Sequence, residues 1–254
     1  MKKRKMVIGN WKMSPDTLKE AQVLNDSIKR KIGSIKKTIA VICPPSIFFS
    51  TLKTRSSSKK FFYGVQNVAK ERGGAYTGEV SASMIKSLGA AFAIVGHSER
   101  RAMGETDEDV CKKIQALLAE KIRPVLCVGE SAMDENANYL SFIKNQLTKG
   151  LSGVVAANIT EVVIAYEPLS AIGAKNPITS HEIHQRNIFI KKVLADLYGK
   201  AKAFDVTILY GGSVNPDNAR ELVEGGEVDG LLVGRASLNA DDFFRIAKVM
   251  DSLS

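Results

Sequence analysis

The chain has 254 residues, of which 44% are hydrophobic and 25% charged, a balance that indicates a folded globular protein and excludes an intrinsically disordered one. Its formal net charge of +9 comes from lysines scattered along the chain, without the arginine-rich block or the aromatic spacing typical of nucleic-acid-binding domains. No apolar run approaches the roughly 20 residues that a membrane-spanning helix needs.

Two further features bear on the compartment. The basic residues 2–5 are followed by only three apolar residues before Gly9, which is too short a run for a signal peptide. Three cysteines, Cys43, Cys111 and Cys127, are an odd number at wide spacing, so neither a disulfide framework nor a zinc site is indicated. We therefore expect a cytoplasmic protein that uses no metal and no cofactor.

Eight short apolar segments alternate with amphipathic helical patterns along the chain. Their runs are continuously apolar rather than alternating with a period of two, which is typical of parallel strands covered on both faces. Eight such units in one domain, residues 1–254, favour a closed (β/α)8 barrel over an open doubly wound sheet. The predicted strands are residues 6–10, 38–43, 61–65, 91–96, 124–128, 162–166, 206–210 and 230–233.

Several helices carry recognisable start signals. Ser14 is a candidate N-cap with Pro15 at the first helical position, and Thr106 precedes three acidic residues that suit a first turn. Asn215 and Pro216 predict the start of a later helix in the same way. The last helix has an apolar face for the core, formed by Phe243, Ile246, Ala247 and Met250.

Polar residues cluster just after the predicted strands, where barrels of this kind build their active sites. Asn10 and Lys12 follow the first strand, His97 and Glu99 the fourth, and Glu167 the sixth. Glycine-rich turns follow the seventh and eighth strands, where backbone N–H groups often bind phosphate. A carboxylate, an imidazole, a cation and an anion site together suit proton abstraction next to a carbonyl in a small phosphorylated substrate.

The chain resembles the triosephosphate isomerase family through motifs spread over nearly its whole length. They are GNWKM (9–13), GAYTGEVS (74–81), VGHSERR (95–101), GETDE (104–108), CVGE (127–130), AYEP (165–168), YGGSV (210–214) and LVG-x-ASL (232–238). The resemblance implies a TIM barrel and an enzyme that interconverts dihydroxyacetone phosphate and D-glyceraldehyde 3-phosphate in glycolysis and gluconeogenesis. The family is itself an established example of tuned acid–base chemistry on this fold, so the roles that follow are implied by the resemblance.

By this resemblance Glu167 is the base that moves the proton between the two carbons through an enediol(ate). His97, kept neutral by a helix N-terminus, would polarise the carbonyl oxygen. Lys12 would stabilise the enediolate and the phosphate, and Asn10 would orient substrate oxygens. Glu99 and Ser98 would support these groups.

The resemblance also implies a phosphate site, a lid and a partner subunit. Phosphate would be bound by the backbone N–H groups of Gly173, Ser213, Gly234 and Arg235. Thr77, in the loop 73–81, would reach towards Lys12 of a second copy in a homodimer. The lid would close over the site and be latched by Tyr210 and Ser213; its residues would be Pro168, Leu169, Ser170, Ala171, Ile172, Gly173, Ala174, Lys175 and Asn176.

Three positions depart from the family pattern. Ser170 stands where the family usually has tryptophan, and Ala174–Lys175–Asn176, followed by Pro177, replaces a Thr-Gly-Lys run in the second hinge. Arg235 stands where the family has a second glycine after the eighth strand. We therefore expect intact chemistry with altered lid motion and phosphate affinity.

Three alternatives stay open on the sequence. Another sugar-phosphate isomerase or epimerase would keep the phosphate site, but does not by itself predict Lys12, His97 and Glu167 together. A barrel that has lost catalysis and serves as a binding protein would explain the altered lid. Nucleic-acid binding through the basic surface is the third.

Overall fold

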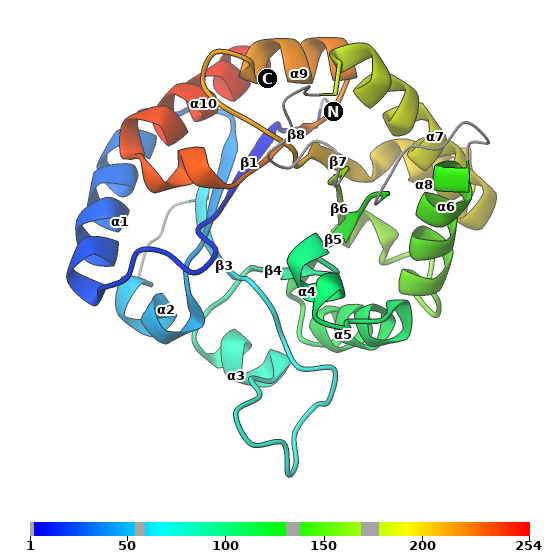
Figure 1. Ribbon diagram of the computed structural model, residues 1–254, viewed down its shortest axis with the longest axis horizontal. Helices are drawn as coiled ribbons and strands as arrows, with labels where there is room; N and C mark the ends of the chain where they lie inside the picture. Colours follow the sequence, from blue (N-terminus) through cyan, green and yellow to red (C-terminus); the bar gives the residue numbers. More distant parts are fainter. Residues whose placement is uncertain (1–2, 54–58, 131–137, 169–177) are drawn as a thin grey trace.

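The computed structural model describes residues 3–53, 59–130, 138–168 and 178–254. Its eight strands form a closed barrel in the order β1 to β8, and every neighbouring pair is parallel. Helices surround the strands, as Figure 1 shows. The (β/α)8 barrel predicted from the sequence is confirmed.

The strands agree with the predicted apolar segments to within one residue at each end for most of the chain. They are β1 (Met6–Asn10), β2 (Ile39–Cys43), β3 (Phe61–Val65), β4 (Phe92–Val95), β5 (Arg123–Val128), β6 (Val163–Tyr166), β7 (Thr207–Tyr210) and β8 (Gly230–Val233). The barrel closes where β1 pairs with β8, with Met6 opposite Gly230. A Cβ atom at Gly230 would lie 1.8 Å from the carbonyl oxygen of Met6, so only glycine fits at this closure.

The strands are apolar on both faces because each face packs against a separate core. One cluster consists of strand side chains and no helical residue, among them Ile8, Ile94, Val125 and Leu209, and therefore fills the barrel interior. The larger cluster combines the alternate strand residues with the inner faces of the helices, and includes Phe243 and Ile246. All four residues predicted for the apolar face of the last helix are buried there.

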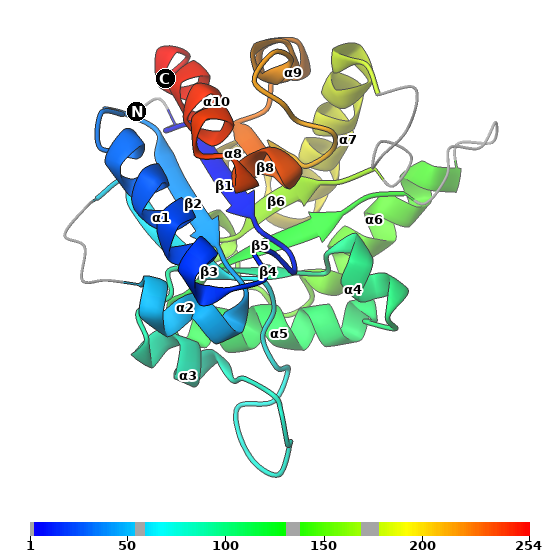
Figure 2. The same ribbon diagram turned by 60° about the vertical axis from the view of Figure 1, so that its left-hand side comes forward.

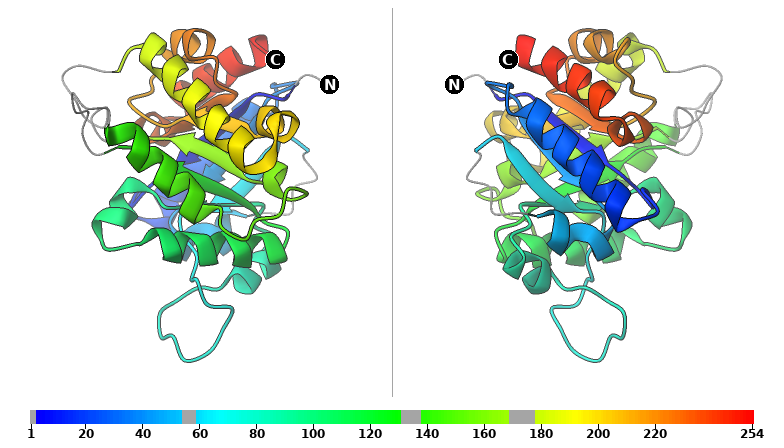
Figure 3. Two further views of the ribbon diagram at one scale, coloured as in Figure 1. Left: turned by 90° about the vertical axis from the view of Figure 1, so that its right-hand side faces the viewer. Right: turned by 90° about the vertical axis from the view of Figure 1, so that its left-hand side faces the viewer.

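The helices follow the strands in the expected alternation, and the views of Figures 2 and 3 show them packed side by side around the barrel. In the right-hand view of Figure 3, α1 lies beside α10, so the first and last helices meet where the barrel closes. The helices are α1 (Leu18–Ile32), α2 (Ser46–Leu52), α3 (Ala82–Ser87), α4 (Ser98–Ala102), α5 (Asp107–Ala119), α6 (Asn138–Gly150), α7 (Ser180–Tyr198), α8 (Lys200–Asp205), α9 (Ala219–Gly226) and α10 (Ala240–Ser252), with short 3-10 turns at Ile159–Glu161 and Arg235–Leu238.

Two of the predicted helix starts are wrong. Helix α1 is capped by Thr17 rather than Ser14, because Thr17 and Glu20 form a reciprocal capping box that satisfies two backbone donors. Helix α9 begins at Ala219, three residues after Pro216, although the Asn215 side chain does accept hydrogen bonds from the backbone of Asp217 and Asn218. The cap predicted at Thr106 is confirmed, since Thr106 and Asp109 form a capping box at the start of α5.

The loop between β3 and α3 projects away from the barrel in all three views (Figures 1, 2 and 3). Tyr76 and Thr77 near its tip are exposed. Within the described ranges, no helix is long and apolar enough to cross a membrane. The three cysteines, all of them in described segments, are unpaired.

Candidate active site

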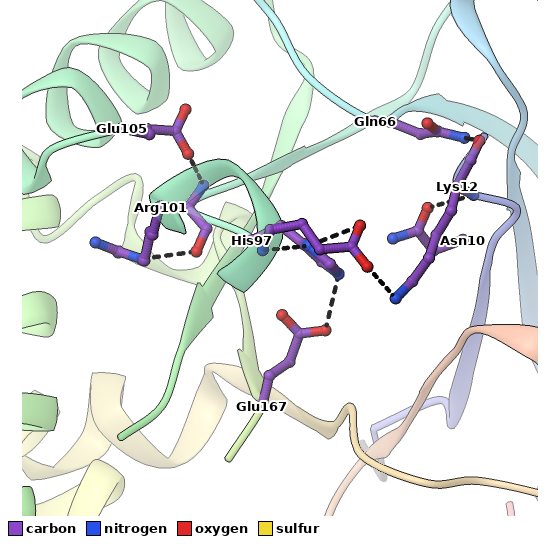
Figure 4. A network of polar contacts seen from close by, with 9 residues as sticks. Asn10, Lys12, Gln66, His97, Arg101, Glu105 and Glu167 are labelled. Atoms are coloured by element: carbon purple, nitrogen blue, oxygen red, sulfur yellow. Dashed lines mark hydrogen bonds and ion pairs between the residues drawn. The ribbon is translucent and has the colours of Figure 1, made fainter. Parts of the chain in front are cut away.

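Four of the five polar residues predicted at the strand ends, Asn10, Lys12, His97 and Glu167, line one cavity of about 740 Å³ at the carboxyl end of the barrel, and Glu99 does not line it. Asn10 is the last residue of β1, His97 lies two residues beyond β4, and Glu167 directly follows β6. Figure 4 shows how Asn10, Lys12, His97 and Glu167 approach one another from these separate strands. The rest of the cavity wall is formed by Trp11, Ser14, residues 211–215, Leu232, Gly234, Arg235, Ala236, Leu238, Asn239 and Asp242.

Glu167 is buried, with only 5% of its surface exposed. Its backbone N–H donates to the carbonyl of Val128, which fixes the residue to the end of β5. Its Oε2 atom has no hydrogen-bond partner among the described residues. Burial raises the pKa of the Glu167 carboxyl, while His97, the Cys127 thiol and Lys12 partly offset that rise. The result is a carboxylate that is a stronger base than an exposed one.

His97 faces Glu167 across the cavity, with its Nε2 atom 3.5 Å from Oε1 of Glu167. It is the N-cap of α4, and its Nδ1 atom accepts a hydrogen bond from the backbone N–H of Glu99 at 3.2 Å. A nitrogen that accepts from an N–H carries no proton, so this contact assigns the neutral tautomer with hydrogen on Nε2. The imidazole therefore presents a donor, not an acceptor, towards the cavity.

Lys12 is held by its backbone as well as by its side chain. Its φ angle of 52° lies in the left-handed region, which costs free energy for any residue other than glycine. The backbone N–H of Lys12 donates to the Asn10 side chain, and the Lys12 carbonyl accepts from the Gln66 side chain at 2.8 Å. Lys12 Nζ lies 2.5 Å from Glu99 Oε1, and this ion pair holds the ammonium group on the side of the cavity where His97 and Glu99 lie (Figure 4).

Part of the cavity is lined by the two turns in which the sequence predicts an anion site, with Gly211, Gly212 and Ser213 after β7 and Gly234 and Arg235 after β8. A Cβ atom at Gly211 would lie 2.6 Å from Glu167 Cγ, and one at Gly212 would lie 2.0 Å from the Tyr210 hydroxyl. A Cβ on Gly234 would contact Lys12 Cε at 3.8 Å, so the lysine adjoins this turn. The backbone thus passes close to the cavity, as a site for an anion requires.

For some of the predicted site residues the structure gives a position but no contact within the site, and others lie outside the described residues. Ser98 is the first residue of α4, and its buried hydroxyl has no hydrogen-bond partner within the described segments. The Arg235 side chain is exposed at the cavity wall. Pro168 is described, whereas Gly173 and the other lid residues 169–176 lie outside the described residues. Among the residues that are described, no group of three or more His, Cys, Asp or Glu side chains is arranged to hold a metal ion.

Two residues at the site were not identified from the sequence. Gln66 binds the carbonyl groups of both Lys12 and Cys43, which ties the turn after β1 to β2 and β3. The Cys127 thiol, in the barrel interior, adjoins the Glu167 carboxylate and lowers its pKa. The position of Gln66 immediately after a strand was a usable signal for the first; the cysteine, which reads as an ordinary apolar strand residue, gave none.

Comparison with known proteins agrees with this geometry. The family model for triosephosphate isomerase matches residues 5–250 of the chain. The triosephosphate isomerase of Alkaliphilus metalliredigens is 39% identical over 96% of this chain and 98% of its own length, and that of Hydrogenovibrio crunogenus is 41% identical over 95% and 96%. The triosephosphate isomerase of Rhodopirellula baltica is 39% identical over 99% of this chain and its own full length.

Proposed function

This chain belongs to the triosephosphate isomerase family and interconverts dihydroxyacetone phosphate and D-glyceraldehyde 3-phosphate, and we propose that Glu167 is the base of that reaction. The observation that carries the assignment is the burial of Glu167 at the cavity wall with one carboxylate oxygen free of hydrogen bonds. A base needs an unpaired oxygen and a pKa near its working range; Oε2 of Glu167 is unpaired within the described residues, and burial raises the carboxyl pKa above its ordinary value, towards that range.

Each residue has one part in the proton transfer. Glu167 takes a proton from the carbon beside the carbonyl, and the electron pair moves to the carbonyl oxygen to give an enediolate. The Nε2–H of His97 hydrogen-bonds the developing oxyanion and moves a proton between the two oxygens. Glu167 then returns its proton to the neighbouring carbon, which completes the exchange of aldose and ketose.

Lys12 and Asn10 are proposed to bind the substrate. The ammonium group of Lys12 lies beside Gly234 and is partnered by Glu99, so it can attract both the enediolate and the phosphate. Asn10 would orient substrate oxygens, and Glu99 and Ser98 would support Lys12 and the start of α4. The phosphate itself would be bound by the backbone N–H groups of Gly173, Ser213, Gly234 and Arg235.

The lid and its latch are proposed from the family pattern. Residues 168–176 would close over the cavity and exclude water, which protects the enediolate from losing phosphate. Tyr210 and Ser213 would hold the closed lid. The support for this is that Tyr210 is the last residue of β7 and that Ser213 lies in the following glycine turn, which lines the cavity.

The assembly and the setting are proposed in the same way. The projecting loop that carries Thr77 would insert next to Lys12 of a second copy, which makes the enzyme a homodimer. The enzyme would work in the cytoplasm, in glycolysis and gluconeogenesis, without a cofactor, and residues 1–254 would form one domain. Sedimentation equilibrium of the purified protein tests the dimer, and a monomeric mass contradicts it.

The decisive experiment measures the interconversion of the two triose phosphates by the purified protein and by Glu167→Gln. A positioned base contributes roughly a hundredfold to ten-thousandfold to a rate, so kcat should fall by that factor in the variant. Glu161→Gln, which changes an exposed carboxylate just before β6, is the matched control and should retain full activity. Activity that survives Glu167→Gln contradicts the assignment of the base.

The alternatives receive no such support. Another sugar-phosphate isomerase does not require Lys12, His97 and Glu167 around one cavity. A barrel without catalysis does not require a buried carboxylate opposite a neutral imidazole. Binding of nucleic acid to the basic surface would be shown by a salt-dependent mobility shift, and we expect none at physiological salt.

A further inference from the structure

We propose that Glu105 and Arg101 are positioning residues for His97. They bind the two peptide groups on either side of Gly96, the residue that precedes His97, and so fix the direction of the imidazole towards Glu167. The inference rests on the proposed role of His97. Figure 4 shows both side chains at the turn, remote from Lys12 and Asn10 and pointing at the backbone rather than at Glu167.

Glu105 binds the first of these peptide groups. Its Oε2 atom accepts the backbone N–H of Gly96 at 3.0 Å. Its Oε1 atom pairs with the ammonium group of Lys113 on α5, and Lys113 in turn donates to the side chain of Asn67 at 2.7 Å. The side chains of Glu105 and Lys113 are only 3% and 7% exposed, so solvent screens neither charge well. One buried carboxylate therefore joins the β4 exit to α5 and to the loop after β3.

Arg101 binds the second peptide group. Its Nε–H donates to the Gly96 carbonyl at 2.7 Å, and its Nη1–H donates to Asp107 at 2.6 Å. Gly96 itself has a φ angle of 69°, and a Cβ atom there would lie 2.9 Å from Arg101 Nη2. The turn thus combines a glycine-only backbone conformation with charged partners on both of its peptide groups.

The contacts at Gly96 influence the orientation of the His97 imidazole through the backbone at the start of α4. The Gly96 carbonyl belongs to the peptide that carries the N–H of His97, so its direction sets the direction of the His97 Cα–Cβ bond. The Nδ1 contact with the Glu99 backbone can form only when the imidazole lies over that first turn. A turn that rotates would weaken this contact, and the hydrogen on Nε2 would no longer be fixed towards Glu167.

The test uses two variants that shorten or reshape the contacts and keep the charge, Glu105→Asp and Arg101→Lys. Asp107→Asn is the matched control, because it weakens the outer partner of Arg101 and leaves both hydrogen bonds to Gly96 in place. Displacing a catalytic group by about 1 Å can cost on the order of a hundredfold in rate, so we expect kcat to fall about tenfold to a hundredfold in the two variants. We expect KM to change by less than about twofold, since no substrate contact is lost.

The readout that separates positioning from general destabilisation is the ¹⁵N NMR spectrum of the His97 imidazole, recorded without substrate. The unmodified protein should show a protonated Nε2 and an unprotonated Nδ1, and the two variants should show both nitrogens shifted towards a mixture of tautomers. Asp107→Asn should leave kcat and the imidazole signals unchanged even if its Tm falls.

Any one of three results would overturn the proposal. They are unchanged imidazole signals in both variants, unchanged kcat in both variants, and a loss of kcat in Asp107→Asn equal to theirs at an equal loss of Tm. If the unmodified protein does not isomerise triose phosphates, the proposed function fails, while the imidazole spectrum still decides whether Glu105 and Arg101 orient His97.

Discussion

The Nε2 atom of His97 lies 3.5 Å from Oε1 of Glu167, and both side chains are almost inaccessible to solvent. They come from the ends of β4 and β6, on opposite sides of β5. Because Nδ1 of His97 is already occupied by a backbone N–H, the face that His97 turns to Glu167 is a hydrogen-bond donor. A buried carboxylate is thus balanced by a neutral donor and not by a full positive charge, and it keeps a raised pKa.

The Cys127 thiol should influence the acid side of the pH profile. The thiol lowers the carboxyl pKa of Glu167, so Cys127→Ala should raise that pKa further. Since the base works only when ionised, kcat/KM should fall at a higher pH in Cys127→Ala than in the unmodified enzyme. The substrate phosphate titrates identically in both profiles and cancels from the comparison. Cys43→Ala, which also changes a buried thiol in the barrel interior, is the control and should leave the acid limb in place.

Removal of the Glu167 charge should stabilise the fold at neutral pH. Because the folded pKa is raised, the penalty for ionising the buried carboxylate is absent below the ordinary value of 4.5, grows as pH rises from that value to the folded pKa, and is complete above the folded pKa. Glu167→Gln should therefore be more stable than the unmodified protein at pH 7, because the substitution removes a charge whose burial is unfavourable. Chemical denaturation at pH 7 and pH 4 measures the difference. A gain in stability of equal size at pH 7 and pH 4 would show that the gain does not come from removing the buried negative charge.

Gly211 should be intolerant of a side chain for a reason specific to the base. In Gly211→Ala the new methyl group would lie 2.6 Å from Glu167 Cγ, so the carboxylate must move. A shift of about 1 Å in a catalytic group can cost on the order of a hundredfold, and we expect kcat to fall by about that factor. Gly150→Ala is the control, because its nearest neighbour would be 3.6 Å away, an ordinary contact. Steady-state kinetics that show equal effects of the two substitutions would refute the explanation.

Lys12 should matter through its place in the cavity and not through its ion pair. The Lys12–Glu99 and Lys70–Asp109 pairs have the same length of 2.5 Å, and their lysines are equally exposed, but of these two lysines only Lys12 lines the cavity. Exposed pairs of this kind contribute little to stability, because solvent screens both charges. Lys12→Met should lower kcat/KM by about a hundredfold or more, the cost of losing one group that stabilises an oxyanion. Lys70→Met should lose a comparable fraction of stability and no activity.

Two of the three departures from the family pattern, Ser170 and Arg235, give one further prediction. Ser170→Trp and Arg235→Gly restore the residues usual in the family, and we expect the first to raise kcat and the second to change KM for the triose phosphates. Both follow from the expectation that the chemistry is intact while lid motion and phosphate affinity differ. Kinetic constants that stay unchanged in both variants would contradict it.

The fold could be predicted from the sequence largely because its strands are covered on both faces. In a chain where apolar runs alternate with amphipathic helices, a mostly apolar run such as residues 206–210 predicts a parallel strand that is buried on both faces. The structure confirms this prediction, since Thr207–Tyr210 is β7. Helix starts were harder, because Ser14 and Thr17 both have side chains suited to an N-cap. Only Thr17 has a glutamate three residues later that completes the capping box. The start of α4 has no such capping signal, because its N-cap is a histidine, and it was expected only from the family resemblance.

The site could be predicted as a set of residues, but not as a set of contacts. The order of strands brings Asn10, His97 and Glu167 to one end of the barrel whatever their exact conformations. Which polar atoms meet depends on side-chain rotamers and on turns such as that at Gly96, and these follow from the packed structure. The contacts of Gln66 with the Lys12 carbonyl and of Lys113 with Asn67 are therefore visible only in the folded chain.

The pairing of β1 with β8 has a consequence for the synthesis of this protein on the ribosome. β1 is among the first segments to emerge, yet one of its two hydrogen-bonding edges is met only by β8, near the end of the chain. Until then the growing chain exposes an unpaired apolar strand edge, a form that readily pairs with other chains. Nascent chains truncated before Gly230 should therefore be held by chaperones or aggregate, and the closed barrel can be reached only once translation is nearly complete.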